Sequence, residues 1–248
     1  MSRDERSPNT ADVIGPSPVI ARGSIEPLGL LPNASNGTLL VRCRLGDDEE
    51  LAVYKPAGLE NPLWDFAEGT LHRREVAAYE VAATLGWPAV PPTVRRDGPF
   101  GPGSVQRFVA FDPDHHFFTL QDERADDFRE IAAFDLVVNN ADRKGGHCLL
   151  DETGGIWAID HGVCFSAEPK LRTVIWDFVD EPIPEMLLAD LRILAVALEP
   201  RARLATTLSQ LLDDDEVIAT GARVAALIAA ARFPAPDPST RPFPWPPI

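Results

Sequence analysis

The stretch "NNADRKGGHCLLDETGGIWAIDHGVCF", residues 139–165, is the most informative part of this sequence. An Asp-Arg-Lys-Gly-Gly-His run stands near its start, and an Ile-Asp-His-Gly run closes a short apolar segment. Asp142 follows a segment with helical periodicity and is therefore expected in a loop. Asp160 ends the apolar segment and precedes Gly162, which suits a carboxylate held at a bend.

Lysine is rare in this chain, and its only lysines are Lys55, Lys144 and Lys170. Lys55 stands at the end of the apolar run "LAVYKP", where a rigid strand would aim the ammonium inward. Glu75 lies 20 positions later in a predicted helix and is a candidate ion-pair partner for Lys55. Glu80 competes for that role.

These acidic and basic side chains match the needs of phosphoryl transfer. That chemistry uses a cation on the phosphates, a divalent metal ion, and a carboxylate that orients the attacking hydroxyl. Lys55 would supply the cation, Asp160 would bind the metal ion, and Asp142 would be the orienting carboxylate. Each also has an ordinary interpretation: a strand-edge lysine whose ammonium reaches water, an Asp-Gly turn, and a solvent-exposed turn after a helix.

The first half of the chain has mainly β character. "TLLVRCRL" (38–45) and "ELAVYKP" (50–56) predict a hairpin inside a β region that spans residues 19–56. Residues 70–85 carry an apolar stripe at helical spacing and predict a helix. "GSVQRFVAF" (103–111) predicts a further strand after the turn-rich "RRDGPFGP".

The second half has mainly helical character. Residues 122–140 predict a helix that leads into the quoted stretch, where "HCLLD" and "IWAID" predict two short strands around the turn "ETGG". Two Ala- and Leu-rich helices are expected at 184–198 and 201–230. The predicted organisation is a disordered segment at 1–18, a β-rich lobe with a hinge at 19–108, a helical lobe at 109–232, and a Pro-rich tail at 233–248.

The bulk composition narrows the function classes. The formal net charge is −15 over 248 residues, whereas a nucleic-acid binder usually has the opposite balance because phosphate neutralisation supplies its affinity. We therefore expect no nucleic-acid partner. No apolar run approaches the roughly 18 residues that cross a bilayer, and the N-terminal residues lack the apolar core of a secretion signal. We expect a cytoplasmic protein without an integral membrane segment.

The three cysteines are Cys43, Cys148 and Cys164, and no two of them form a CxxC pair. Because their number is odd and they are far apart, we expect buried thiols rather than disulfides. Zinc binding by Cys148 and Cys164 with His147 or His161 is a less favoured alternative, because the spacing does not suit a closed structural site.

The order of these motifs resembles the protein-kinase-like superfamily: strand-Lys, helix-Glu, helix followed by an Asp-Arg loop, then strand-Asp-x-Gly. Four motifs are most similar to the phosphatidylinositol 3/4-kinase branch, especially type II phosphatidylinositol 4-kinases and their bacterial relatives: "LAVYKP", "GSVQRFV", "FDLVVNNADR" and "AIDHGVCF". The resemblance covers roughly residues 23–190. The resemblance implies an α+β, two-lobed protein-kinase-like fold with a small β-rich N-terminal lobe and a mainly helical C-terminal lobe. It also implies an ATP- and divalent-metal-dependent kinase.

Site roles follow from the resemblance. Asp142 is the implied catalytic residue, and Lys55 is implied to contact the α- and β-phosphates. Asp160 is the implied ligand of Mg²⁺ or Mn²⁺. The other implied nucleotide-binding residues are Glu75 through its pairing with Lys55, Gln106, Arg107 and Phe108 at the adenine, and Ser35, Asn36 and Gly37 over the phosphates.

One position departs from the family pattern. The place five residues after the catalytic Asp, usually Asn and a second metal ligand, holds His147. Magnesium favours oxygen ligands, whereas imidazole suits manganese, zinc and similar ions better. His147 is therefore either a ligand for a softer ion, a phosphate contact, or the mark of a weakened enzyme.

We expect the acceptor to be a hydroxyl on a protein, a lipid or a small molecule, and the resemblance suggests a lipid or a protein. Because the chain lacks the basic amphipathic stretch that would hold an anionic membrane, a protein or a soluble small molecule is favoured. Two other functions stay open. The first is a pseudokinase, a nucleotide-binding or scaffold module without catalysis. The second is a Ser or Cys hydrolase, which is disfavoured because no Gly-x-Ser-x-Gly elbow is present.

Overall fold

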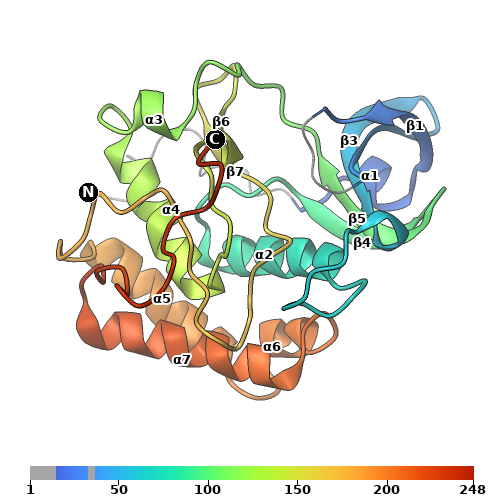
Figure 1. The fold of residues 1–248 in the computed structure, drawn as a ribbon. Coiled ribbons are helices and arrows are strands. Elements are labelled where there is room, and N and C mark those ends of the chain that lie inside the picture. Colours follow the sequence, from blue (N-terminus) through green and yellow to red (C-terminus); the bar gives the residue numbers. More distant parts are fainter. Residues whose placement is uncertain (1–14, 33–36) are drawn as a thin grey trace.

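The computed structural model of this chain describes residues 15–32 and 37–248. The described part has two lobes: a small lobe built on a sheet and a larger, mainly helical lobe. Figure 1 shows the blue and green sheet on the right and the helices on the left and below. This arrangement is the α+β, two-lobed organisation expected from the sequence.

The small lobe is an antiparallel five-stranded sheet with the order β1-β2-β3-β5-β4. Its strands are β1 (Ser24–Leu30), β2 (Leu39–Leu45), β3 (Asp48–Pro56), β4 (Thr93–Gly98) and β5 (Gly101–Arg107). The predicted hairpin is confirmed, since β2 and β3 pair from Leu39–Tyr54 to Leu45–Asp48. Because β3 is the middle strand, its backbone is held on both sides.

Helix α2 (Leu71–Leu85) follows β3 and the short 3-10 helix η3 (Ala57–Leu59). It lies between the sheet and the lower helices in Figure 1, and 11 of its 15 residues are buried. The helix ends at Gly86, whose φ of 81° is the left-handed conformation that glycine adopts at helix C-termini. The helix predicted over residues 70–85 is therefore confirmed.

The described part of the large lobe contains three longer helices and several short elements. Its helices are α3 (Phe117–Leu120), α4 (Ala125–Val138), α5 (Glu185–Ala197), α6 (Arg203–Leu208) and α7 (Asp214–Ala230). A two-stranded hairpin of β6 (Cys148–Leu150) and β7 (Ile156–Ala158) follows the 3-10 helix η4 (Gly145–His147). The predicted helices at 122–140 and 184–198 and the predicted short strands are confirmed.

Two separate apolar cores underlie the two lobes. The smaller core lies under the sheet and is built from α1, β2, β3 and β5, with Ile20, Val41, Tyr54 and Val105 fully buried. The larger core contains the buried apolar residues of α2, α4, α5, α6, α7 and the hairpin. Since α2 contributes to the larger core, the helix is anchored to the large lobe while its N-terminal half faces β3.

Two segments differ from the expectations. Residues 19–22, predicted as β structure, belong to helix α1 (Pro18–Arg22), which begins with Ser17 accepting a hydrogen bond from the Ile20 amide. The single helix expected over 201–230 is split into α6 and α7, because Asp213 and Glu216 form a capping box that starts α7. Within α7, Glu216 is buried and pairs with Arg74 at 2.7 Å.

The strand predicted over 103–111 is shorter than expected, since β5 ends at Arg107. The proposed division of the chain into segments at 108/109 and 232/233 stays a prediction, and residues 1–14 of the expected disordered segment lie outside the described residues. No helix in the described ranges is both long enough and apolar enough to span a bilayer.

Candidate active site

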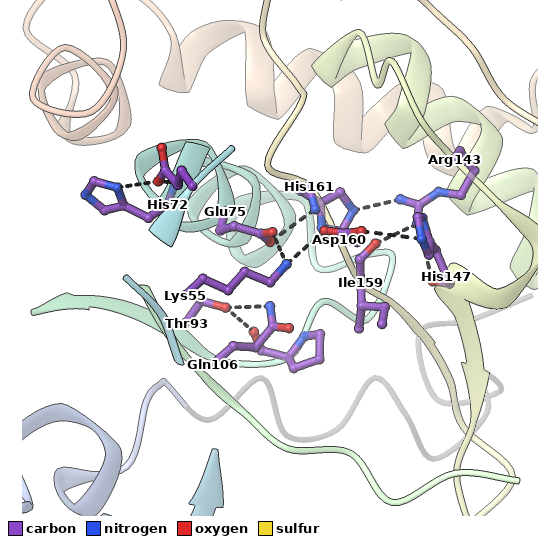
Figure 2. Close-up of polar contacts among 12 residues, drawn as sticks. Lys55, His72, Glu75, Thr93, Gln106, Arg143, His147, Ile159, Asp160 and His161 are labelled. Carbon is purple, nitrogen blue, oxygen red and sulfur yellow. Dashed lines mark hydrogen bonds and ion pairs between the residues drawn. The ribbon is translucent and has the colours of Figure 1, made fainter. Parts of the chain in front are cut away.

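Lys55 projects from the central strand of the sheet toward α2. Side chains alternate along a strand, so Ala52 and Tyr54 enter the small core while Val53 and Lys55 face the other way. The ammonium of Lys55 forms hydrogen-bonded ion pairs with Glu75 and with Asp160, the latter at 2.8 Å (Figure 2). The predicted pairing of Lys55 with Glu75 is confirmed, and the competing residue Glu80 is not part of it.

Glu75 joins the two lobes through both of its carboxylate oxygens. Oε1 accepts from Lys55, and Oε2 accepts from the backbone amide of His161 at 3.1 Å. Burial raises the pKa of Glu75, against the opposing attraction of Lys55. For Lys55, burial by itself would lower the pKa, but Asp160 and Glu75 together raise it above its ordinary value. The ammonium is therefore held in its charged form.

The end of α4 presents Asp142. The helix closes at Asn139, which takes a left-handed φ of 51°, a conformation that Asn tolerates better than most residues. Asn140 accepts a hydrogen bond from the Asp142 amide at 2.9 Å, and Lys144 lies 3.4 Å from the Asp142 carboxylate. Burial, helped by the nearby Asp160 charge and opposed by Lys144, raises the pKa of Asp142 to about 6.

The β6–β7 hairpin places His147 beside Asp160. Cys148 pairs with Ala158 in the register of the hairpin, and the Ile159 amide donates to the His147 carbonyl at 3.0 Å. The residues before β6 and after β7 therefore meet, with His147 Nε2 3.4 Å from Asp160 Oδ2. This closeness comes from antiparallel pairing and is independent of the 13 positions that separate the two residues in the sequence.

The charges of this pair are set by their surroundings. Lys55 holds the pKa of Asp160 far below its usual range, so the carboxylate is ionised at neutral pH. Burial lowers the pKa of His147 to about 4, against the opposing attraction of Asp160. The imidazole is therefore neutral. Its Nδ1 accepts a hydrogen bond from the Lys144 amide at 3.4 Å, so the ring proton is on Nε2 and points to Asp160. The anionic Asp160 oxygen and the His147 Nε2 lie side by side, and Nε2 would become a nitrogen ligand once its proton has moved to Nδ1 or left the ring.

The buried side chain of Arg143 contacts several of the segments that carry the site residues. Its fully buried guanidinium forms an ion pair with Asp135 of α4. It also donates to the Ile159 carbonyl at 2.8 Å and to His161 Nε2 at 2.7 Å. Because a guanidinium only donates, the Nε2 of His161 is the acceptor. One side chain thus connects α4, the loop that carries Asp142, and the bend at Asp160; Figure 2 shows its contacts with Ile159 and His161.

A cavity of about 540 Å³ lies between the lobes, within the usual size range of small-molecule sites. Lys55, Asp142, His147 and Asp160 all line it. The remaining lining residues come from both lobes and include the apolar side chains of Val53, Leu149 and Ile159. The cavity therefore combines an apolar wall with one group of charged side chains.

Some of the nucleotide-binding residues implied by the resemblance line the cavity, and others lie outside the described residues. Gln106, Arg107 and Phe108 line the cavity, but the Gln106 amide donates to Thr93 and the Arg107 guanidinium lies 4.7 Å from the centre of the Trp157 ring. The side chains of Gln106 and Arg107 therefore already have partners. Gly37 also lines the cavity, whereas Ser35 and Asn36 lie outside the described residues.

The cysteines do not form a site. Cys43, Cys148 and Cys164 are free and buried, as expected, and burial raises the pKa of Cys148 to about 12. A protonated, buried thiol is neither a good metal ligand nor a nucleophile. Within residues 15–32 and 37–248, no group of three or more His, Cys, Asp or Glu residues is arranged to hold a metal ion. The zinc and cysteine-hydrolase alternatives have no support here.

Sequence reasoning missed the residues that brace the site. Asp135 sits in the apolar "FDLVV" run of α4, and a charge in such a run is a signal that a buried partner exists. At the far side of the cavity, Glu60 accepts hydrogen bonds from the Leu71 and His72 amides and contacts the His72 ring at 2.9 Å. No local pattern marks Glu60.

Comparison with known proteins places the chain in a family. No family model matches it. Protein Rv2133c from Mycobacterium tuberculosis (strain ATCC 25618 / H37Rv) is 38% identical over 263 residues, which covers 92% of this chain and 94% of that protein. This chain belongs to the family of Rv2133c.

Two solved structures resemble the fold. The Helicobacter pylori proinflammatory kinase CtkA superposes with a TM-score of 0.53 at 12% identity, covering 86% of this chain and 94% of that one. The structure of hydra Fam20 with sugar gives a TM-score of 0.53 at 14% identity, covering 86% of each chain. The fold of the Rv2133c-family chain is therefore protein-kinase-like, as the sequence resemblance implied. The phosphatidylinositol 3/4-kinase branch stays a prediction.

Proposed function

We propose that this protein is an ATP- and divalent-metal-dependent phosphotransferase that acts on a hydroxyl acceptor. The observation that carries the proposal is the convergence of Lys55, Asp142, His147 and Asp160 on one cavity between the lobes. Phosphoryl transfer depends on positioning and on electrostatic stabilisation of the phosphates. This cavity offers a cation, a metal-binding carboxylate and a second carboxylate at the surface of a single space.

The apolar wall suits the base of the nucleotide. Val53, Leu149 and Ile159 line the cavity beside the end of β5, and flat aromatic ligands bind between apolar side chains. Because the Gln106 and Arg107 side chains are engaged elsewhere, we assign recognition of the base edge to the backbone of residues 106–108. Lys55 would then meet the α- and β-phosphates.

The residues at the hairpin base fit a divalent ion. Asp160 is ionised and 44% exposed on its side chain, and neutral His147 has its Nε2 beside Asp160 Oδ2. Phosphate oxygens would complete the ligands, as they do for nucleotide-bound ions. When bound, the ion would neutralise charge on the phosphates. The mixed oxygen and nitrogen donors favour manganese over magnesium.

Asp142 is the candidate base. Its pKa of about 6 leaves it ionised at neutral pH while keeping appreciable proton affinity, which is the range in which a general base works best. The hydrogen bond from its amide to Asn140 fixes the start of the loop. Lys144, 3.4 Å away, adds a second cation at the same end of the cavity. There the ammonium would lie close to the transferred group.

The class of acceptor and membership of the phosphatidylinositol 3/4-kinase branch are also parts of this proposal. A resemblance to type II phosphatidylinositol 4-kinases supports a lipid hydroxyl, and the net charge of −15 disfavours an anionic membrane surface. We therefore place protein and soluble small-molecule hydroxyls ahead of lipid. The alternative function is a pseudokinase, which His147 favours because it replaces the usual Asn.

The test is γ-phosphoryl transfer by the purified chain, run with magnesium and with manganese, beside a nucleotide thermal-shift measurement. We expect transfer, loss of turnover in Asp142→Ala with nucleotide binding kept, and weaker metal-dependent nucleotide binding in Asp160→Ala. A thermal shift without transfer under either metal would favour the pseudokinase. Wild-type turnover in both variants would show that the assigned roles are wrong.

A further inference from the structure

The Pro-rich segment 242–248 lies against the loop between Asp142 and His147. The Pro247 carbonyl accepts a hydrogen bond from the Gly145 amide at 2.8 Å. Ile248 is the nearest neighbour to the space beside Gly146. Figure 1 shows the dark red end of the chain passing α4 and reaching the β6–β7 hairpin. Segments about a hundred positions apart in the sequence are thus in direct contact.

A second anchor holds the same segment. The Pro242 carbonyl accepts from the Thr173 amide at 3.0 Å and from the indole of Trp176 at 3.2 Å. Thr173 in turn sits in a short parallel bridge with Arg143, where the Val174 amide donates to the Arg143 carbonyl at 3.1 Å. The segment therefore extends a ladder of backbone contacts that begins next to Asp142.

The composition of the segment suits this kind of contact. Proline has no N–H, so a Pro-rich run offers carbonyl acceptors and lacks many donors of its own. An extended proline segment also loses little conformational entropy when it binds. Both anchors use the segment's carbonyls, at Pro242 and Pro247, while Phe243 and Trp245 are 52% and 75% exposed. The backbone binds and these two side chains face solvent.

The loop that receives the segment needs support. It contains Gly145 and Gly146 in succession, and glycine has the greatest backbone freedom of any residue. Gly145 is buried; a side chain there would meet the Phe118 ring at 2.8 Å and the Pro247 carbonyl at 3.5 Å. The close approach of both neighbours holds the loop on two sides. Without Pro247, the amide of Gly145 loses its partner.

We propose that residues 242–248 are a positioning element of the active site, fixing the glycine loop so that Asp142 and His147 keep their relative places. The inference rests on the proposed phosphotransferase function. Among the described residues, none of this segment lines the cavity. Its removal should therefore lower kcat and leave nucleotide affinity close to that of the full chain.

The experiment compares the full chain with a chain that ends at Arg241. We expect kcat to fall on the order of 10²-fold in the shortened chain, the size of effect caused by about 1 Å of misplacement, with the nucleotide KM changed less than about twofold. Phe243→Ala in the full chain is the matched control and should keep full kcat, because its backbone carbonyls are intact. A synthetic peptide of residues 241–248, added in trans, should restore activity to the shortened chain.

Amide hydrogen exchange separates this inference from the proposed function. Exchange at Gly145 and Thr173 should be faster in the shortened chain, and the peptide should restore protection. If the full chain proves inactive but exchange responds in this way, the phosphotransferase proposal fails and the positioning contact stands. Unchanged exchange at both amides, or unchanged kcat in the shortened chain of an active protein, overturns the inference.

Discussion

The ammonium of Lys55 lies 2.8 Å from Asp160 Oδ1, although 105 positions separate the two residues in the sequence. The contact joins a strand of the small lobe to the bend that follows the β6–β7 hairpin of the large lobe, at the wall of the cavity. Glu75 binds the same ammonium and also accepts from the amide that follows Asp160. One cation is therefore shared by two carboxylates. Under the proposed function, the nucleotide phosphates would replace Asp160 as a partner of this ammonium.

Replacing Lys55 should remove most activity. In Lys55→Met, two carboxylates lose their shared cation and the phosphates lose theirs, so we expect kcat/KM to fall by roughly 10²- to 10³-fold, the range found when a single stabilising donor is removed. Lys170→Met is the matched control, because Lys170 pairs with Asp65 and does not line the cavity. Equal loss in both variants would point to a structural effect.

Activity should rise with pH around the titration of Asp142. Its carboxyl is protonated below the folded-state pKa of about 6 and becomes a base above it, so kcat should increase as pH rises from 5 to 7 and then level off. Asp142→Asn should lower kcat by about 10²- to 10⁴-fold and remove this inflection. A wild-type profile without an inflection between pH 5 and 7 would contradict the assignment.

The metal preference should depend on His147. We expect the wild-type chain to be more active with manganese than with magnesium, because a neutral imidazole is the second donor beside Asp160. His147→Asn supplies an oxygen donor and should shift the preference toward magnesium. The measurement is initial rate against metal concentration for both ions. Magnesium clearly superior in the wild-type chain would count against His147 as a ligand.

Arg143 should matter more for stability than any exposed arginine. Its guanidinium and the Asp135 carboxylate are completely buried, and breaking such a pair leaves an uncompensated charge, so Arg143→Ala should cost about 3–5 kcal/mol. That corresponds to a fall in Tm of roughly 10 °C for a chain of this size. Arg192→Ala removes an exposed pair with Glu185 and should cost less than about 1 kcal/mol. Thermal unfolding of both variants tests the contrast.

Local patterns were sufficient for the longer elements. The apolar stripe of residues 70–85 predicts α2, and the two β-prone runs at 38–45 and 50–56 predict the β2–β3 hairpin, because these signals extend over many residues. Short elements were missed. Helix α1 has five residues, too few for periodicity to show, and the Ala- and Leu-rich composition continues across the break between α6 and α7.

The partners of the charged side chains were harder to predict from the sequence. Glu75 and Glu80 both lie on α2, and their spacing alone does not tell which one faces β3, because that depends on how the helix docks. The structure selects Glu75. The contacts of Arg143 with Asp135, Ile159 and His161 likewise join three segments whose approach is set by packing of the large core.

The sequence by itself determined which residues have the right chemistry: the rare lysine at the end of a strand, and the two aspartates beside a turn and a bend. Those properties depend on residue type and near neighbours. Only the tertiary structure decided that Lys55, Asp142, His147 and Asp160 share one cavity, and that residues 242–248 hold the glycine loop. The physical reason is that such distances follow from how two lobes and a distant segment pack, which local periodicity does not record.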